Sequence, residues 1–363
     1  MKLFKLCLFC LFVSTQMFAQ QAGGKKIVII TFDGLRWKDI FTGADSTKLY
    51  TSVSKLKNAK EEITKFWSQN SELRKQKLMP FFWETIAAKG QVYGNRDKGS
   101  FVNVTNPFWF SYPGYNEIFT GHADTRINSN DYGPNPNQTV QEYINKQPGY
   151  KNSVAAFASW AAFSRILNKE RCGFPVNAGY EEFKTGVITP KQQALNETQM
   201  LLPKVFGNNE RPDAVTYYLA KEYMKQNHPK VLQISFIETD AYAHRNLYKD
   251  YLSSAYNNDK MLEDIWNYIQ TDPFYKDQTT LFLANDHGRG GNDGDDWTHH
   301  NSKTPGSDQI WFAVLGPDVK PLGEVKSVQI YQNQYAKTIA ALLGIDFKSP
   351  NKVGDVIKTV VQK

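Results

Sequence analysis

Three apolar runs in this chain end directly at an acidic residue. IVIITFD ends at Asp33, VLQISFIETD ends at Asp240 and TTLFLAND ends at Asp286. Continuous runs of apolar, largely β-branched residues predict strands that are buried on both faces, as in a parallel sheet. Because open α/β sheets bind ligands at the carboxyl ends of their strands, we expect the three carboxylates to lie close together.

Helical spacing of apolar residues dominates the segments between these runs. Helices are predicted at residues 46–79, 77–90, 111–121, 139–146, 160–168, 191–205, 213–227, 245–272 and 332–345, and further strands at 91–95, 153–159 and 308–317. Strands that alternate with helices predict an α/β fold with a mainly parallel central sheet and helices on both faces. The sequence contains no internal repeat and no linker-like tract. We therefore expect one catalytic domain over residues 20–363, with a cap-like insertion at about 125–225.

The first 19 residues have the composition of an export signal. Lys2 and Lys5 precede an apolar core, and small and polar residues follow up to Ala19. This pattern predicts a secretory signal peptide that is cleaved after Ala19. The alternative is an anchor helix, but the apolar stretch is short for a bilayer and no stop-transfer charges follow. The protein is therefore expected in the periplasm or secreted, with no membrane span in the mature chain.

Cysteine and charge narrow the possible functions. After signal cleavage Cys172 is the only cysteine, which excludes an internal disulfide and a cysteine-ligated metal; it is either a packing residue or a nucleophile.

The formal net charge is +7, or +5 without the signal lysines. Because the charged segments mix both signs, we infer no nucleic-acid binding. A mild basic excess suits small anionic substrates.

Histidines accompany the three carboxylates. Of the six histidines, four lie in these segments or just after them, namely His244, His287, His299 and His300. Carboxylate and imidazole ligands suit zinc, and this set has too many anions for one structural ion. Two ions would stabilise both the attacking and the leaving oxygen of an in-line displacement. Taken singly, an Asp at a strand end is commonly a helix cap or a turn residue, and His299-His300 could be a solvated loop.

The segment SYPGYNEIFTG, residues 111–121, contains a candidate nucleophile. Pro113-Gly114 predicts a tight turn that leads into a helix. A hydroxyl at the helix start, such as that of Ser111, is exposed to the positive end of the helix dipole, which stabilises an anion or an alkoxide. The alternative is that Ser111 only caps the helix.

The order of these motifs resembles the alkaline phosphatase superfamily, especially its nucleotide pyrophosphatase/phosphodiesterase branch and related secreted bacterial phosphoesterases. The matching segments, spread over about residues 26 to 343, are Asp33, Ser111-Tyr112-Pro113 leading to Thr120-Gly121, Asp240 with His244, Asp286-His287-Gly288, and a histidine of WTHHN. Ser stands where that branch usually has Thr, and both are used across the superfamily.

The resemblance implies two zinc ions per chain and a ligand set for each. One zinc would be held by Asp240, His244 and a late histidine, for which the spacing favours His300 over His299. The other would be held by Asp33, Asp286, His287 and the Ser111 oxygen. The resemblance further implies that Ser111, ionised beside zinc, attacks phosphorus and forms a phosphoseryl intermediate that water then hydrolyses.

The sequence predicts the metal ligands residue by residue, but it leaves more than one class of substrate open. Sulfatases of the superfamily need Arg in a C/S-x-P-x-R segment, and Tyr115 stands at that position. A phosphate monoester dianion is best bound by Arg or Lys, for which Arg165 is the candidate, although Arg165 can equally be a surface residue. A diester needs less charge and is bound through Asn in the phosphodiesterase branch. Asn128 or Asn130 could serve, or could simply belong to an Asn-rich turn.

The sequence therefore predicts an exported, zinc-dependent phosphodiesterase or broad phosphatase that acts on small phosphate esters. Two alternatives stay open. One is a phosphoryl-group transferase acting on envelope sugars or lipids, although such enzymes usually carry membrane helices. The other is a non-catalytic, metal-stabilised binding protein, although a pseudoenzyme is expected to have lost the nucleophile or a ligand.

Overall fold

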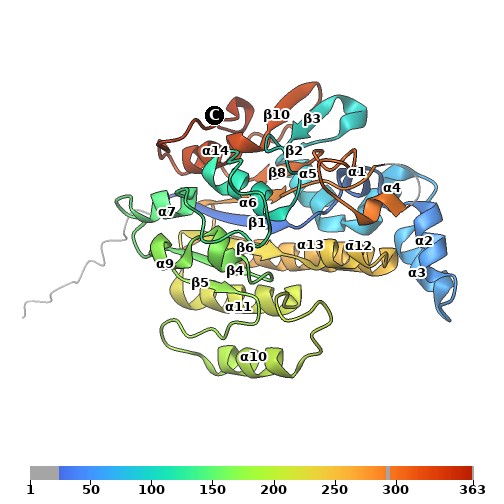
Figure 1. Cartoon of the computed structure of the whole chain (residues 1–363), viewed down its shortest axis with the longest axis horizontal. Helices are drawn as coiled ribbons and strands as arrows, with labels where there is room; N and C mark the ends of the chain where they lie inside the picture. The colour runs from blue at the N-terminus through green and yellow to red at the C-terminus, as the bar shows by residue number, and fades with distance from the viewer. Residues whose placement is uncertain (1–23, 292–294, 362–363) are drawn as a thin grey trace, which may run out of the picture.

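Eight strands form the central sheet of the computed structural model, which describes residues 24–291 and 295–361 (Figure 1). The strand order across the sheet is β5-β4-β6-β1-β7-β8-β2-β9. In that order the strands span Val176–Ala178, Val154–Ala158, Val231–Phe236, Lys26–Phe32, Thr279–Asn285, Phe312–Leu315, Gln91–Tyr93 and Gly323–Glu324. The signal peptide predicted at residues 1–19 lies outside the described residues.

Most neighbouring strands of this sheet run parallel. β5, β4, β6, β1 and β7 are parallel to one another, whereas β8 is antiparallel to both β7 and β2. The predicted α/β class with a mainly parallel sheet is therefore confirmed. A second sheet pairs β3 (Ser100–Asn103) with β10 (Val328–Tyr331), and the apolar pattern did not predict it.

Each face of the sheet is covered by its own hydrophobic core. Side chains of β1 alternate between the two: Val28 and Ile30 belong to one core, and Ile27 and Ile29 belong to the other. This alternation follows from the two-residue period of a strand, and burial on both sides explains the unbroken apolar run in the sequence.

Helices supply the outer layers on both sides of the sheet (Figure 1). Helices packed into the first core are α1 (Trp37–Thr42), α2 (Ser46–Val53), α3 (Ala59–Phe66), α4 (Ser71–Leu78), η1 (Phe82–Ile86), α5 (Ala87–Lys89), α11 (Asp213–Asn227), α12 (Glu238–His244) and α13 (Tyr248–Thr271). Helices packed into the second core are α6 (Ser111–Thr120), α7 (Val140–Asn145), α8 (Phe163–Ile166), α9 (Lys169–Cys172), α14 (Tyr335–Leu342) and α15 (Lys358–Val361). Short 3₁₀ turns are η2 (Arg96–Lys98), η3 (Asp295–Thr298) and η4 (Gln332–Gln334).

The helical region predicted at 46–79 consists of three short helices. New helices start after Asp45 and Asn70, whose side chains accept hydrogen bonds from the backbone N–H groups of Lys48 (3.0 Å) and Glu72 (2.9 Å). Such caps satisfy amide groups that a helix start leaves unpaired. The Asp45 cap marks the start of the predicted region, and the Asn70 cap separates α4 from α3 within it.

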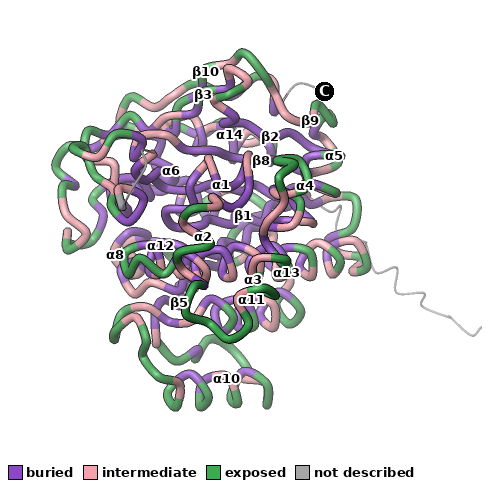
Figure 2. The backbone as a smooth tube through the Cα atoms, turned by 90° about the vertical axis from the view of Figure 1, so that its right-hand side faces the viewer, coloured by how far each residue is buried: buried purple, intermediate pink, exposed green. Residues whose placement is uncertain are grey.

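The cap-like insertion expected at residues 125–225 does not form a separate unit. β4, β5 and α11 all fall within these residues, and they belong to the central sheet and to its helical layer. Only α10 (Pro190–Leu201) stands outside these layers, where it packs on α11 and exposes much of its surface (Figure 2). The apolar runs of β4 and α11 are long enough to be buried in the main domain, which explains the difference.

Candidate metal centre

Three neighbouring strands deliver the acidic side chains to one edge of the sheet. β1 lies between β6 and β7, and Phe32 at its end is level with Phe236 and Asn285. Asp33 and Asp286 are the next residues after β1 and β7. Beyond β6 the chain turns at once into α12, which contains Asp240. The convergence of the three strand ends therefore agrees with the sequence prediction.

Helix α12 and the loop after η3 form the first ligand group. The His244 Nε2 atom lies 3.1 Å from Asp240 Oδ2 and 2.9 Å from His300 Nε2. Two facing imidazole nitrogens at this distance cannot both carry hydrogen, so at least one lone pair points into the space between them. The ligand atoms of Asp240, His244 and His300 all lie within 4.8 Å of one another. His299 is exposed and belongs to neither ligand group among the described residues.

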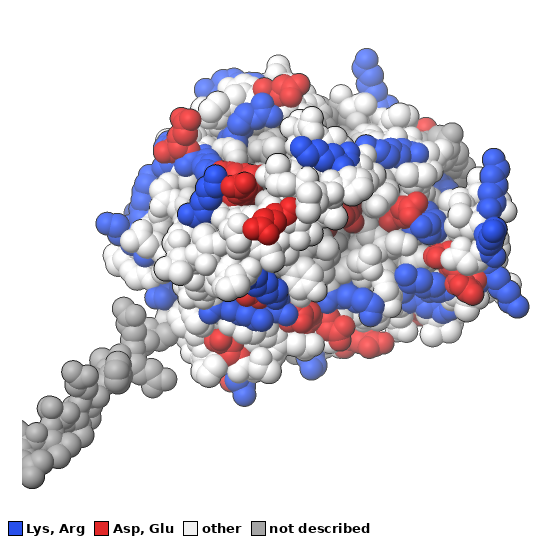
Figure 3. Space-filling view, turned by 90° about the horizontal axis from the view of Figure 1, so that it is seen from below, with Lys and Arg blue, Asp and Glu red and all other residues white. Residues whose placement is uncertain are grey.

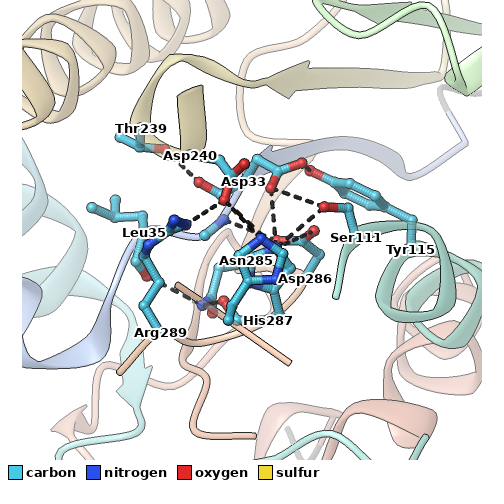
Figure 4. Close-up of polar contacts among 12 residues, drawn as sticks. Asp33, Leu35, Ser111, Tyr115, Thr239, Asp240, Asn285, Asp286, His287 and Arg289 are labelled. Carbon is cyan, nitrogen blue, oxygen red and sulfur yellow. Dashed lines mark hydrogen bonds and ion pairs between the residues drawn. The ribbon is translucent and has the colours of Figure 1, made fainter. Parts of the chain in front are cut away.

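The second ligand group is fully enclosed and centres on His287 (Figure 4). The His287 Nε2 atom lies 3.3 Å from Asp33 Oδ1, 3.5 Å from Asp286 Oδ2 and 3.8 Å from Asp240 Oδ1. Asp240 thus adjoins both groups. Asp33, Asp286 and His287 are each 0% exposed. The structure therefore brings together all six carboxylate and imidazole ligands that the resemblance implied.

Ser111 faces this second group from the start of α6. Its Oγ atom lies 3.2 Å from His287 Nε2 and 3.4 Å from Asp33 Oδ1 (Figure 4). No side chain caps the helix, whose N-cap position is Phe110. Gly114 allows the close approach of α6, since a Cβ atom there would lie 2.4 Å from the Asp286 carbonyl oxygen. The Ser111 hydroxyl therefore contacts the ligand side chains and does not serve as a helix cap.

Arg289 is a site residue that the sequence reasoning missed. Its side chain is completely buried, and its Nη1 atom forms an ion pair with Asp240 Oδ1. Its Nε and Nη2 atoms donate to the carbonyl oxygens of Trp297 (2.8 Å) and Thr298 (3.0 Å). Arg289 thus joins Asp240 to the segment just before His300. Its position directly after Asp-His-Gly was the available signal, because an Arg next to buried ligands needs a partner.

Tyr115 is a second residue whose role the sequence did not reveal. Its hydroxyl donates to Asp33 Oδ2 at 3.0 Å, while Ser111 and His287 face Asp33 Oδ1 (Figure 4). A hydrogen bond to the outer oxygen of a metal-binding carboxylate fixes its orientation. Tyr115 lies one helical turn after Ser111, on the same side of α6, and this i,i+4 spacing could have indicated the contact.

Gly34 lets the backbone pass through the middle of the site. It has a left-handed φ of +56°, and a Cβ atom there would lie 2.7 Å from Asp240 Oδ1. Its N–H donates to Asp286 Oδ1 at 3.0 Å. The Asp-Gly pair that ends the first apolar run is therefore required by the crowding of the site as well as by the turn.

The charges of the site fit divalent cations. Burial and Asp240 raise the pKa of Asp33, and burial and Asp33 raise the pKa of Asp286 well above its usual value. Burial alone would lower the pKa of His287, but Asp286 and Asp33 raise it to about 9. The buried Asp286 Oδ2 and His300 Nδ1 atoms have no hydrogen-bond partner among the described residues. Because buried anions need compensating charge, these oxygen and nitrogen donors suit zinc.

The three predicted substrate-binding residues have different surroundings. Asn128 is exposed. Asn130 accepts a hydrogen bond from the Tyr112 N–H at 2.9 Å, which puts its side-chain amide beside the residue that follows Ser111. Arg165 donates to the carbonyl oxygens of Asn130 (3.0 Å) and Asp131 (3.3 Å). Arg165 therefore holds the loop that carries Asn130.

Replacing Arg289 with alanine is expected to destabilise the metal-free protein by about 3 to 5 kcal/mol, because Asp240 would lose its buried partner. Urea unfolding of chelator-treated protein measures this difference. Lys184→Ala is the matched control, since it breaks an exposed ion pair with Glu182 (2.9 Å) and should cost less than about 1 kcal/mol. Equal losses in the two variants would contradict a structural role of the Arg289–Asp240 pair.

Solved structures of other proteins have a similar architecture. No protein-family model matches the sequence, and no curated protein matches it. Among solved structures, the lipoteichoic acid synthase LtaP from Listeria monocytogenes is similar, with a TM-score of 0.61 and 13% identity over 94% of this chain and 77% of that chain. The alkaline phosphatase PafA has a TM-score of 0.60 and 12% identity over 93% of this chain and 99% of that one.

A sulfatase also shares the architecture. BT1596, a 2-O GAG sulfatase, has a TM-score of 0.57 and 13% identity over 94% of this chain and 76% of that chain. Because a synthase, a phosphatase and a sulfatase have such close scores, the likeness selects no branch and no substrate. It does extend over nearly the whole of the described chain, and the chain therefore has the fold of the alkaline phosphatase superfamily.

Proposed function

We propose that this protein is a zinc-dependent phosphoesterase, acting as a phosphodiesterase or a broad phosphatase, with Ser111 as its nucleophile. The observation that carries the proposal is the position of the Ser111 hydroxyl. It faces His287 and Asp33 at 3.2 and 3.4 Å, and it makes no capping bond to a backbone amide of α6. A hydroxyl directed at buried metal-type ligands is suited to ionisation and attack on phosphorus.

Two zinc positions are part of the proposal. Asp240, His244 and His300 would hold one ion, and Asp33, Asp286, His287 and the Ser111 oxygen would hold the other. Zinc ions there would supply the positive charge that favours the ionised Ser111 hydroxyl and the departing oxygen.

The protein's own residues orient this chemistry. Ser111 Oγ forms a bond to phosphorus while the bond to the leaving oxygen breaks, and water later cleaves the Oγ–P bond. Tyr115 holds Asp33 so that one carboxylate oxygen faces Ser111, and Arg289 holds Asp240 against the loop of His300. These contacts hold Asp33 and Asp240 in place before the substrate arrives, which reduces the reorganisation that the reaction needs.

A diester is the substrate that the neighbourhood of Ser111 favours. The Asn130 side-chain oxygen is held by the Tyr112 N–H, so its NH₂ group can donate to a non-bridging oxygen of a phosphate at Ser111. Arg165 is engaged with two backbone carbonyl oxygens and supports Asn130. Because the Arg165 guanidinium is engaged in this way, a singly charged diester at Ser111 would be held more easily than a monoester dianion.

Export is proposed from the residues that precede the domain. Lys2, Lys5 and the apolar stretch up to Ala19 support cleavage and secretion or periplasmic residence. Within residues 24–291 and 295–361, no helix has the length and apolar character needed to cross a membrane.

Lysines, arginines and acidic residues are interspersed on the face seen in Figure 3, with no broad area of one sign.

A phosphoryl-group transferase is the alternative, and the likeness to a lipoteichoic acid synthase is the observation that favours it. The two functions share the attack by Ser111 and differ in the acceptor of the phosphoryl group. A hydrolase passes it to water, whereas a transferase passes it to a hydroxyl group of a second substrate. Products formed in the presence of glycerol or a sugar distinguish them, since a transferase would form a new phosphate ester at a rate that increases with the alcohol.

Removal of metal is expected to abolish hydrolysis of nitrophenyl phosphate mono- and diesters, because the ionised Ser111 hydroxyl and the leaving oxygen would lose their compensating charge. The native enzyme should contain about two zinc ions per chain, and zinc added after chelation should restore turnover. Metal analysis and nitrophenol release provide the two readouts. Full activity in zinc-free protein would contradict the proposal, and zinc binding without turnover of any ester would favour the binding-protein alternative.

A further inference from the structure

The excess of positive charge in this protein lies in one segment, residues 46–79, which contains α2, α3 and α4. This segment has eight lysines and arginines and three glutamates, and therefore a net charge of +5. The rest of the mature chain has equal numbers of basic and acidic residues. The whole net charge of the mature chain is thus concentrated in these three helices and their connections.

The turn between α2 and α3 carries the most accessible part of this charge. Lys55, Lys57 and Lys60 are exposed, and Leu56 has an exposed fraction of 39%. None of the three lysines forms an ion pair with a described residue. The two helices lie at one end of the molecule, on the right of Figure 1, and Figure 2 shows this end facing the viewer. We call these four residues the basic tip.

Helix stability does not explain the lysines of the basic tip. Lys60 is in the first turn of α3, where the positive end of the helix dipole repels a cation. Glu61 and Glu62 of the same turn compensate only part of the charge. Because like charges that gather in one place lower the stability of a folded chain, the basic tip is better explained by a partner of opposite charge.

Helix α2 connects the basic tip to the surroundings of the metal centre. A cavity of about 180 Å³ lies between this helix and the segments that carry two of the ligands, and its lining residues are Thr47, Lys48, Thr51, Ser52, Asn246, Tyr248 and Trp297. Asn246 is two residues after His244, and Trp297 is three residues before His300. The basic tip therefore belongs to the helices that border the exposed ligand group.

We propose that the basic tip docks the protein on a membrane surface that contains anionic lipids. Each lysine close to such a surface strengthens binding about fivefold. Leu56 distinguishes a membrane from a soluble polyanion, because an apolar side chain among lysines enters the headgroup region of a bilayer. A projecting turn also fits a flat surface, and the proposed export would bring the protein to one. The inference adds to the proposed phosphoesterase function and does not depend on it.

Sedimentation with lipid vesicles tests this inference on the zinc-loaded mature protein. Vesicles of equal parts phosphatidylcholine and phosphatidylglycerol supply the anionic surface, and vesicles of phosphatidylcholine alone are the neutral reference. The unmodified protein should bind the anionic vesicles about a hundredfold more strongly, because three lysines act together. Added salt should weaken this binding, since it screens exposed charges.

The triple variant Lys55→Gln, Lys57→Gln, Lys60→Gln should lower binding to anionic vesicles by about a hundredfold. Its matched control removes the same charge from three exposed lysines of the C-terminal part, Lys326, Lys348 and Lys352. The control should lose less than about threefold, because these charges lie away from the basic tip and are screened. Both variants should hydrolyse a soluble nitrophenyl ester at the unmodified rate, since no ligand or nucleophile is changed.

Leu56→Ser should weaken binding to anionic vesicles by about fivefold, because less apolar surface leaves water. No binding to either kind of vesicle, equal binding to both, or equal losses in the two lysine variants would overturn the docking surface. Binding that depends on the lysines but is unchanged in Leu56→Ser would overturn the membrane as partner and favour a soluble polyanion. Hydrolysis of soluble esters is measured separately, so failure of the docking surface is distinguishable from failure of the proposed function.

Discussion

Ser111→Ala is expected to lower ester hydrolysis by about a thousandfold or more while leaving the fold and both zinc positions in place. The physical reason is that Ser111 Oγ is the atom that would form the bond to phosphorus. Its contacts are limited to His287 at 3.2 Å and Asp33 at 3.4 Å, which are long for hydrogen bonds and contribute little to stability. Nitrophenol release and thermal unfolding measure the two effects separately.

Two further variants sharpen this experiment. Ser111→Thr retains the oxygen and should keep partial activity. Ser46→Ala changes the serine at the first position of α2, which forms no hydrogen bond with a ligand side chain among the described residues, and it should leave turnover unchanged. Unimpaired turnover in Ser111→Ala would show that the hydroxyl has only a structural role.

His300→Ala is expected to lose about one zinc ion per chain and most turnover, whereas His299→Ala should retain both ions. His300 Nε2 lies 2.9 Å from His244 Nε2 and 3.5 Å from Asp240 Oδ1, so its loss removes one of three donors that converge on the same point. His299 is exposed, and its backbone carbonyl oxygen, which accepts from the Gly290 N–H at 3.1 Å, is present in alanine as well.

Metal analysis of the two purified variants, side by side with the unmodified protein, decides between the adjacent histidines. Because both variants change one residue of the same loop, a general effect on folding would appear equally in each. The reverse pattern, with zinc lost only in His299→Ala, would contradict the ligand assignment and leave the remaining donors unaffected.

The sequence was sufficient to predict the strands that end directly before Asp33 and Asp286. The run predicted as one strand up to Asp240 is divided, because β6 ends at Phe236 and Asp240 lies in α12. A strand buried on both faces is mostly apolar, and the acidic residue that follows such a run marks the edge of the sheet. Together with the helical periodicity between the strands, this signal determined the α/β class. Ligand geometry at the ends of β1 and β7 follows almost directly, since Asp33 and Asp286 are the next residues after paired strands in register.

Only the tertiary structure decided the features that depend on side-chain direction in loops. The motif spacing favoured His300 over His299 without showing which side chain turns inward. In the structure the side chain of Arg289 bonds to the carbonyl oxygens of Trp297 and Thr298, just before His300, and His300 lies in the ligand group. Asn128 and Asn130 differ in the same way, because one hydrogen bond from Tyr112 holds Asn130 beside the nucleophile.

The sequence also did not predict the contacts between residues that lie far apart along the chain. The hydrogen bond from Tyr115 to Asp33 joins residues 82 positions apart. The i,i+4 spacing from Ser111 indicates the side of α6 on which Tyr115 lies, but it does not indicate which distant carboxylate Tyr115 contacts. Within residues 125–225, where a cap-like insertion was expected, β4, β5 and α11 belong to the main sheet and its helical layer. An apolar strand shows that it is buried but not against which sheet. Periodicity therefore determined which residues are buried and where strands end, whereas the packing of distant segments determined which polar side chains meet.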